Sequence, residues 1–326
     1  MDFLEAVEAT TLPCGFDDAD SAFNRAPQNY EDGGEPAVGR RRLSYAGMRV
    51  GIHYVDEYIT ELTSAQETFL KDTLIPKLTA WIEDAIKVVP VSGNLLIPRR
   101  CDATWSIDAT SDPDGILTGH PNDCAIYSTA KCNTVTIPDQ FLDEARYCPS
   151  TSSLSGSGHC SDATLLAAGA GKANADILVF VTATTDSTVD TSGKCVAGGA
   201  TAAFATHCAN DQNDRPVAGF INFCPEDVKE AEEHLDDQFG IARHELMHVL
   251  AMSRSLFAYF RDADGDPRTP RDADGTPSTT ALCGYYPATN TVETATLRGK
   301  TVHRIVTPAV VAEARAQYGI ATGASC

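Results

Sequence analysis

The motif His244-Glu245-Leu246-Met247-His248 constrains this chain more than any other part of its sequence. Apolar residues recur around it at helical spacing, which predicts that the motif lies on an α-helix. Residues four positions apart share one face of a helix, so the two imidazoles can reach a single metal ion together. The alternative is an ordinary amphipathic helix with two histidines, and the predicted strands that precede the motif favour the metal site.

Glu245 has a different place on this helix, about 100° around the axis from His244. From there its carboxylate can lie beside the ion without binding it, as a general base for a metal-activated water must. Leu246, Met247 and Val249 are apolar, so we expect the rest of the helix to be packed and dry. A dry environment strengthens the effect of the ion on its water. The motif therefore predicts a metal-dependent hydrolase.

A catalytic zinc ion usually has three protein ligands and one water, and the third protein ligand is not evident here. The metzincin motif places a glycine three residues after the second histidine and a third histidine six residues after it. This chain has Ala251 and Arg254 at those positions. One histidine follows, His303, and we favour a strand or loop histidine over a ligand there. Glu293 and Glu313 are further candidates, but no E-x-x-x-D pattern supports them.

The net charge argues against several classes of partner. The chain has 45 acidic and 25 basic residues, a formal net charge of −20, which repels nucleic acid and anionic lipid. No run of 18 apolar residues is present, so no membrane-spanning segment is predicted. Protein or peptide substrates remain the expected partners.

Eleven cysteines are spread along the chain without a C-x-x-C pair. This pattern is typical of disulfides formed in an oxidising compartment, and a cytosolic protein with inert thiols is the alternative. The N-terminal residues have neither the basic start nor the apolar stretch of a secretion signal. We therefore expect a secreted or cell-surface protein whose signal sequence is missing from this chain.

Four segments have the β-branched or alternating composition of strands: 48–55, 175–186, 201–208 and 216–225. A helix is predicted from a capping box at Ser64 and Glu67 to about Lys87. Pro76 should either kink this helix or begin its second half.

Two more helical patterns follow, at 226–252 with an interruption at Gly240, and at 307–318. The predicted fold class is therefore α+β, a twisted mixed sheet with a long active-site helix against it. The sheet should draw on strands near 48–55, 175–183 and 216–223. Residues 1–43 lack periodicity and are interpreted as a tail or pro-segment remnant, and 101–172, with five cysteines, as a disulfide-rich insertion.

The blocks HELMHVLAMS, SLFAYFRD and TPAVVAEARAQYG resemble the leishmanolysin (gametolysin-like) metalloproteases. Upstream, LIPKLTAWIEDAIKVVPVSGNLLIP, ADILVFVTATTD and ATHCANDQNDRPVAGFINFCP follow the order of that family. The resemblance covers about residues 48–320 and is weakest over 101–172. It implies a metzincin-like zinc endopeptidase, secreted or attached to the cell surface, with one zinc ion per chain. His244 and His248 match its zinc ligands and Glu245 its catalytic glutamate.

The resemblance also implies where the third ligand lies. In this family a long insertion separates the second histidine from the third, and VVAEARAQYG belongs to that insertion. The third histidine is thus expected after Cys326, and residues 44–326 would be a catalytic domain that lacks its C-terminal part. Cys160 and Cys208 occupy positions that look like a family disulfide pair.

Two alternatives remain open. Asp262, Asp264 and Asp266 have the spacing of calcium ligands, but the loop lacks a glutamate at position twelve, so a solvated loop is favoured over a Ca²⁺ site. Since only two zinc ligands are recognised in this chain, it could instead be a catalytically inactive, secreted or cell-surface adhesion or binding module on the same scaffold.

Overall fold

The computed structural model describes residues 24–25, 45–99, 101–104, 124–127, 129–147, 164–271, 277 and 291–319. The chain forms two compact units, which are described separately. The larger unit is Ala19–Leu250, and the smaller one includes Ala251–Cys326.

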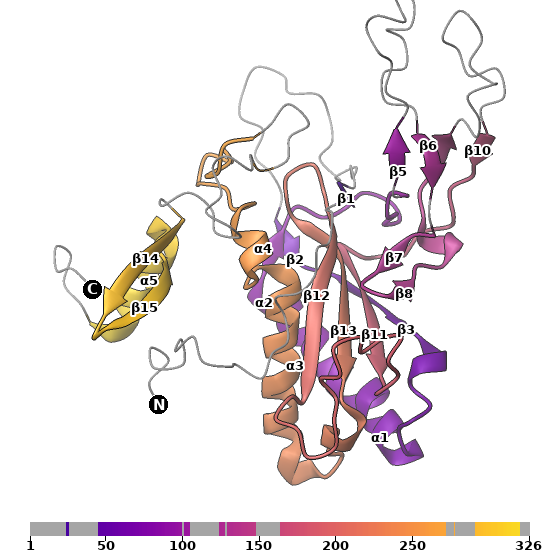
Figure 1. Ribbon diagram of the computed structural model, residues 1–326, viewed down its shortest axis with the longest axis horizontal. Coiled ribbons are helices and arrows are strands. Elements are labelled where there is room, and N and C mark those ends of the chain that lie inside the picture. Colours follow the sequence, from indigo (N-terminus) through magenta and orange to yellow (C-terminus); the bar gives the residue numbers. More distant parts are fainter. Residues whose placement is uncertain are drawn as a thin grey trace, which may run out of the picture. The chain divides into compact units, whose positions relative to one another are not determined.

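A five-stranded mixed sheet is the centre of the larger unit (Figure 1). Its strands, in spatial order, are β1 (Asn24–Arg25), β12 (Ala203–Asn210), β13 (Pro216–Phe223), β11 (Ile177–Ala183) and β3 (Val50–Tyr54). β12 and β13 are antiparallel, and the other neighbours are parallel. The four predicted strands and the mixed sheet are confirmed. β1 lies inside the segment that was predicted as a tail, and it adds an edge to this sheet.

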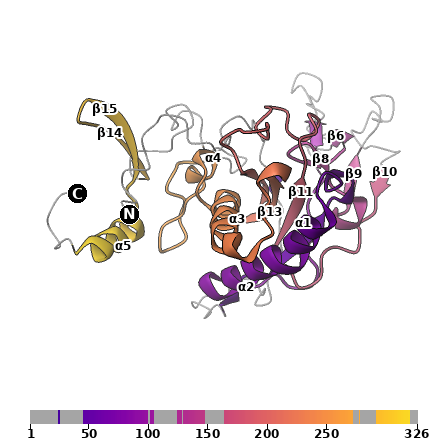
Figure 2. The ribbon, with the colours of Figure 1, turned by 90° about the horizontal axis from the view of Figure 1, so that it is seen from below.

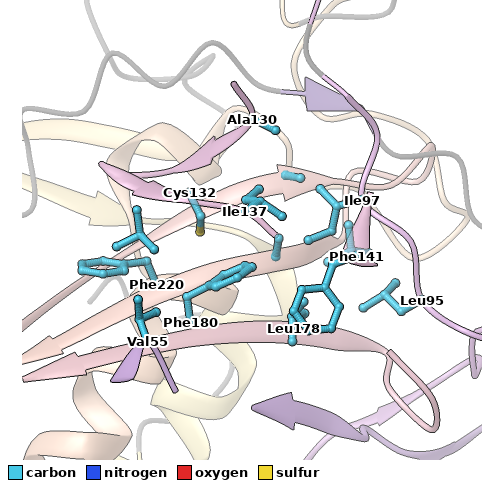
Figure 3. Close-up of a cluster of buried hydrophobic side chains, with 14 of the residues drawn as sticks. Val55, Leu95, Ile97, Ala130, Cys132, Ile137, Phe141, Leu178, Phe180 and Phe220 are labelled. Carbon is cyan, nitrogen blue, oxygen red and sulfur yellow. The ribbon is translucent and has the colours of Figure 1, made fainter. Parts of the chain in front are cut away.

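Each face of the sheet is covered by its own buried cluster. As a result, every residue of the central strands β11 and β13 is buried. On one face Phe180 and Phe220 pack with Phe141, Ile97 and Leu95 from the loops over the sheet (Figure 3). On the other face the helices cover the sheet with a set of fully or almost fully buried side chains: Leu70, Leu74, Leu78, Ile82, Leu246 and Val249.

The first helical segment comprises α1 (Ser64–Thr68), a π-helical turn (Phe69–Leu74) and α2 (Ile75–Ala85). The predicted capping box at Ser64 and Glu67 is wrong by one residue. The backbone of Thr63 is extended and that of Ser64 is already helical, so Thr63 is the N-cap and forms the box with Gln66. Pro76 begins the second half, one of the two predicted alternatives, because a first turn tolerates its missing N–H.

The described part of 101–172 is a second, four-stranded sheet. Its order is β10 (Thr164–Leu166), β9 (Ala145–Tyr147), β6 (Cys124–Tyr127), β5 (Cys101–Thr104). The larger unit also contains two short strand pairs: β7 (Lys131–Cys132) with β8 (Val135–Thr136), and β2 (Ala46–Gly47) with β4 (Lys87–Val88).

Two disulfides lie in the described residues, Cys132–Cys208 and Cys195–Cys224. The pairing of Cys208 with Cys160 that the resemblance implied is therefore wrong, because β7 brings Cys132 within bonding distance of β12 instead. Cys160 itself lies outside the described residues.

The long helix α3 (Leu235–Leu250) follows β13 after 3₁₀ turns at Pro225–Asp227 and Glu232–His234. The helix thus begins nine residues after the predicted start at Glu226, and Gly240 does not interrupt it. A glycine in a helix costs about 1 kcal/mol relative to alanine, which the burial of Leu246 and Val249 outweighs.

The smaller unit contains α4 (Arg254–Phe257), the hairpin of β14 (Val292–Leu297) and β15 (Lys300–Ile305), and α5 (Pro308–Tyr318). Thr307 caps α5 and Gly319, at φ 63°, ends it, which confirms the predicted third helix. Among the described helices of the whole chain, none has the length and apolarity needed to cross a bilayer.

Candidate metal centre

The position of α3 is fixed by a close approach to the sheet, seen from below in Figure 2. Gly219 on β13 faces Val249, and a Cβ atom on this glycine would lie 2.1 Å from Val249 Cγ1. Ala242 and Leu246 are buried on the same side of the helix. The apolar stripe thus holds the last two turns of α3, which carry the motif, against β12 and β13.

His244 and His248 converge on one point, one helical turn apart. Their Nε2 atoms lie 3.0 Å from each other, and the ring centroids are 4.6 Å apart at an interplanar angle of 82°. Burial lowers the pKa of His244, which favours the neutral imidazole that a metal ion binds. The spacing predicted from the sequence therefore brings the two nitrogens together.

Glu245 lies on the packed side of the helix with 4% of its surface exposed. Burial raises the pKa of its carboxyl group to about 8, and the positive charge of Lys194 acts in the opposite direction. Its Oε2 atom is buried and has no hydrogen-bond partner among the residues that the structure describes. A buried carboxyl oxygen without a partner is suited to hold or accept a proton.

The loop that carries Lys194 is fastened at the carboxyl end of β13. Asp190 accepts hydrogen bonds from the backbone N–H groups of Lys194 (2.9 Å) and Cys195 (2.7 Å). Cys195 is joined to Cys224, at the end of β13. The ammonium group of Lys194 lies 4.9 Å from the ring centroid of Phe204 on β12. These bonds keep a positive charge within electrostatic range of Glu245.

The leishmanolysin family model matches residues 155–324, 170 of the 326 residues, and this range includes α3 and its motif. The chain belongs to the leishmanolysin family.

Curated relatives agree with this assignment. The chain is 31% identical over 306 residues to a leishmanolysin-like peptidase of Drosophila melanogaster, with 88% of this chain covered and 42% of the relative. It is 29% identical over 287 residues to a leishmanolysin-like peptidase of Caenorhabditis elegans, with 84% of this chain and 40% of the relative covered. It is 30% identical over 196 residues to the ciliated left-right organizer metallopeptidase of Xenopus laevis, with 58% of this chain and 24% of the relative covered. The chain thus spans about two fifths of the length of the leishmanolysin-like peptidases that it matches.

In this leishmanolysin-family chain, no group of three His, Cys, Asp or Glu side chains that could hold a metal ion occurs among the residues with described structure. His303 lies on β15 as a strand histidine, and its Nδ1 is 2.9 Å from Thr294 Oγ1. Glu293 accepts a hydrogen bond from Arg304 at 2.7 Å. Ala251 does not have a positive φ, so the chain leaves α3 without the left-handed turn that a glycine there would serve.

The aspartate loop is explained by its own backbone. Asp262 Oδ1 accepts hydrogen bonds from the N–H groups of Asp264 (3.0 Å) and Asp266 (2.9 Å). The carboxylate therefore closes a turn around Gly265. Asp272 and Asp274, in a repeat of the DADG sequence ten residues later, lie outside the described residues.

Lys194, whose positive charge acts on Glu245, was not predicted from the sequence. Asn222 on β13 was not predicted either; it accepts from Thr182 Oγ1 at 2.6 Å, and its amide group donates to the carbonyl of Thr184 at 3.1 Å. Neither residue belongs to a recognised motif. The one available signal was the cysteine beside Lys194, which marked its loop as one that a disulfide could fix.

Proposed function

We propose that the protein is a zinc-dependent endopeptidase of the metzincin type, in which His244 and His248 bind the ion and Glu245 is the general base. The observation that carries this proposal is the 3.0 Å separation of the two Nε2 atoms. Two nitrogens bound to zinc at 2.0–2.1 Å in a tetrahedron lie about 3.3 Å apart, so the pair needs only a small adjustment to fit the ion.

The chemistry divides between the ion and this chain. When bound, zinc supplies a Lewis acid that lowers the pKa of a water and polarises the scissile carbonyl group. Glu245 then has two tasks: its carboxylate takes a proton from the attacking water and later gives it to the amine that leaves. The buried Oε2 atom of Glu245 suits both tasks, because within the described part of the chain no hydrogen bond occupies it.

The third ligand is proposed to come from a part of the protein that follows Cys326. Two observations support this: the described residues hold no three-ligand group, and the chain spans 42% of its Drosophila relative. Residues 44–326 would then be the N-terminal part of the catalytic domain with the start of the family insertion. His303 is the alternative ligand within the chain.

We further propose that the protein works outside the cytosol, either secreted or at the cell surface, on protein substrates. The disulfides Cys132–Cys208 and Cys195–Cys224 support an oxidising compartment. The names of the relatives, peptidase and metallopeptidase, support the substrate class.

Zinc stoichiometry tests the proposal, measured on the 326-residue chain and on a form that continues past Cys326. We expect one zinc ion per chain in the longer form only, together with cleavage of an unfolded protein. Zinc held one-to-one by the shorter form would place the third ligand within it, and His303→Ala would then be the first variant to lose the ion. No zinc in either form would overturn the enzyme and favour the adhesion or binding module.

A further inference from the structure

Arg243 directly precedes His244 in the motif helix, and its side chain packs against two aromatic rings. Its guanidinium carbon lies 5.1 Å from the ring centroid of Phe239 and 5.5 Å from that of Trp81. The two rings meet edge to face, with centroids 6.2 Å apart and an interplanar angle of 88°. A guanidinium group over an aromatic ring is held by a cation–π attraction, so these three side chains form a defined cluster, the Arg243 stack.

The Arg243 stack joins two helices. Phe239 lies one turn before Arg243 on α3, whereas Trp81 lies on α2, which is in contact with α3 (Figure 2). Both aromatic side chains are partly buried and pack against the apolar cluster between these helices and the sheet. The stack therefore fastens α3 to α2 at the helical turn that carries His244.

The described interactions of Arg243 are with these rings and not with an acidic group. The residue is exposed and the chain has 45 acidic residues, yet within the described part of the chain its guanidinium group forms no ion pair. Lys77, the other cation near Phe239, lies 4.8 Å from the ring centroid and is paired with Asp236 at 3.4 Å. The place of Arg243 is thus determined by the rings of two helices.

The position of His244 depends strongly on the backbone of its helix. Histidines that bind a metal ion usually donate a hydrogen bond from the ring nitrogen that faces away from the ion, and this bond fixes the ring. The Nε2 atom of His244 faces His248, and its Nδ1 atom has no hydrogen-bond partner among the residues with described structure. The orientation of this imidazole is therefore set by its rotamer and by the helical turn that the Arg243 stack holds.

The stack and the contact between Gly219 and Val249 hold different sides of α3. Val249 packs on β13, and Arg243, six residues earlier, packs toward α2. A helix that is held on two sides cannot rotate about its axis without breaking one of the two contacts. Such a rotation would move the imidazole of His244 away from that of His248.

We propose that Arg243 is a positioning residue of the metal centre: packed against Trp81 and Phe239, it fixes the turn of α3 from which His244 reaches the ion. Arg243 itself contacts neither the ion nor the substrate in this role. The inference rests on the proposed function, because it takes His244 and His248 as metal ligands.

Binding of copper(II) iminodiacetate to the 326-residue chain tests this role without a third protein ligand. The complex is electrically neutral and leaves two positions that a pair of imidazoles can fill, so the charge of residue 243 has little direct effect on it. We expect Arg243→Met to weaken binding about two- to fivefold in isothermal titration calorimetry, because the stack can transmit no more than the free energy of an exposed cation–π contact. Arg99→Met is the matched control: Arg99 bonds to Asp139 and Asp143, so binding should not change.

A double-mutant cycle separates positioning from a general loss of structure. Trp81→Leu removes the ring on α2, and if the stack acts as a unit, the double variant with Arg243→Met should bind no more weakly than the weaker single variant. His244→Ala should lose the copper complex. Wild-type affinity in Arg243→Met, or losses that add in the double variant, would overturn the positioning role. A wild-type chain that binds no better than His244→Ala would also overturn it.

The copper experiment also distinguishes this inference from the proposed enzyme. If the form that continues past Cys326 takes up no zinc while the copper results are as expected, the endopeptidase is wrong and the positioning role of Arg243 stands. If that form takes up zinc but Arg243→Met binds the copper complex like the wild type, the positioning role is wrong and the endopeptidase stands.

Discussion

Gly219 and Val249 are in direct contact, and this contact determines how closely the motif helix approaches the sheet. Because Gly219 has no side chain, α3 lies near enough for Val249 Cγ1 to occupy the place of a Cβ atom. His248 and Glu245 are one and four residues from Val249, so any displacement of the helix here moves the residues of the proposed metal centre.

Gly219→Ala should therefore destabilise the protein and weaken the metal centre. The methyl group overlaps Val249, and overpacking of this kind costs about 1–3 kcal/mol. Urea unfolding measures the first effect, and the zinc affinity of the form that continues past Cys326 measures the second. Gly240→Ala is the matched control: nothing lies within 4 Å of that position, so it should leave zinc affinity unchanged and stabilise the helix by up to about 1 kcal/mol. Equal behaviour of the two variants would contradict this role of Gly219.

This contact also indicates which features could be predicted from the sequence. The spacing of His244 and His248 was sufficient to predict that their imidazoles lie together, because residues four positions apart share one face of a helix whatever surrounds it. The strand β11 was predicted within 175–186 from its β-branched composition. Local chemistry of this kind determines an element without knowledge of the fold.

Features that depend on contacts between distant segments could not be predicted. The pairing of Cys132 with Cys208 needs the position of β7 over β12, and composition does not define it. Gly240 has the residue type that ends helices, yet α3 continues through it because tertiary packing outweighs propensity. The location of Lys194 near Glu245 depends on a disulfide whose partner was unknown.

Glu245→Gln should abolish peptide hydrolysis in the form that continues past Cys326 and leave zinc content near one per chain. The amide has the same shape but cannot accept a proton, and general-base catalysis contributes typically 10²–10⁴-fold. His244→Ala should remove both zinc and activity, while His234→Ala, in the 3₁₀ turn before α3, should remove neither. Turnover by Glu245→Gln at near the original rate would refute the assigned role.

His207 should make the stability of the protein depend on pH. It is 1% exposed on β12, and burial lowers its pKa to about 3 from an ordinary value near 6.5. The unfolded chain therefore binds a proton more readily than the folded one, so this contribution is complete above pH 6.5 and is lost as the pH falls toward 3. The slope is at most about 1.4 kcal/mol per pH unit.

The measurement is the difference in unfolding free energy between the wild type and His207→Gln from pH 7 to pH 4. Glutamine does not titrate, so the difference should shrink steadily as the pH falls, whatever the carboxyl groups contribute to both proteins. His234→Gln, at an exposed position, should track the wild type. A difference that stays constant with pH would show that His207 does not titrate in this range.

Removal of the disulfide with Cys195→Ala and Cys224→Ala should have two separable effects. The disulfide joins two residues with a sequence separation of 29, so its loss should lower the free energy of unfolding by about 2–4 kcal/mol. Loss of the disulfide also releases the loop that holds Lys194 over Phe204, and with it the positive charge near Glu245. Turnover of the form that continues past Cys326 should therefore fall under conditions where that variant is fully folded. The pair Cys132→Ala and Cys208→Ala is the control, since that bond joins β7 to β12 and not this loop. If both pairs lost stability alike and neither changed turnover of the folded enzyme, the loop of Lys194 would be structural only.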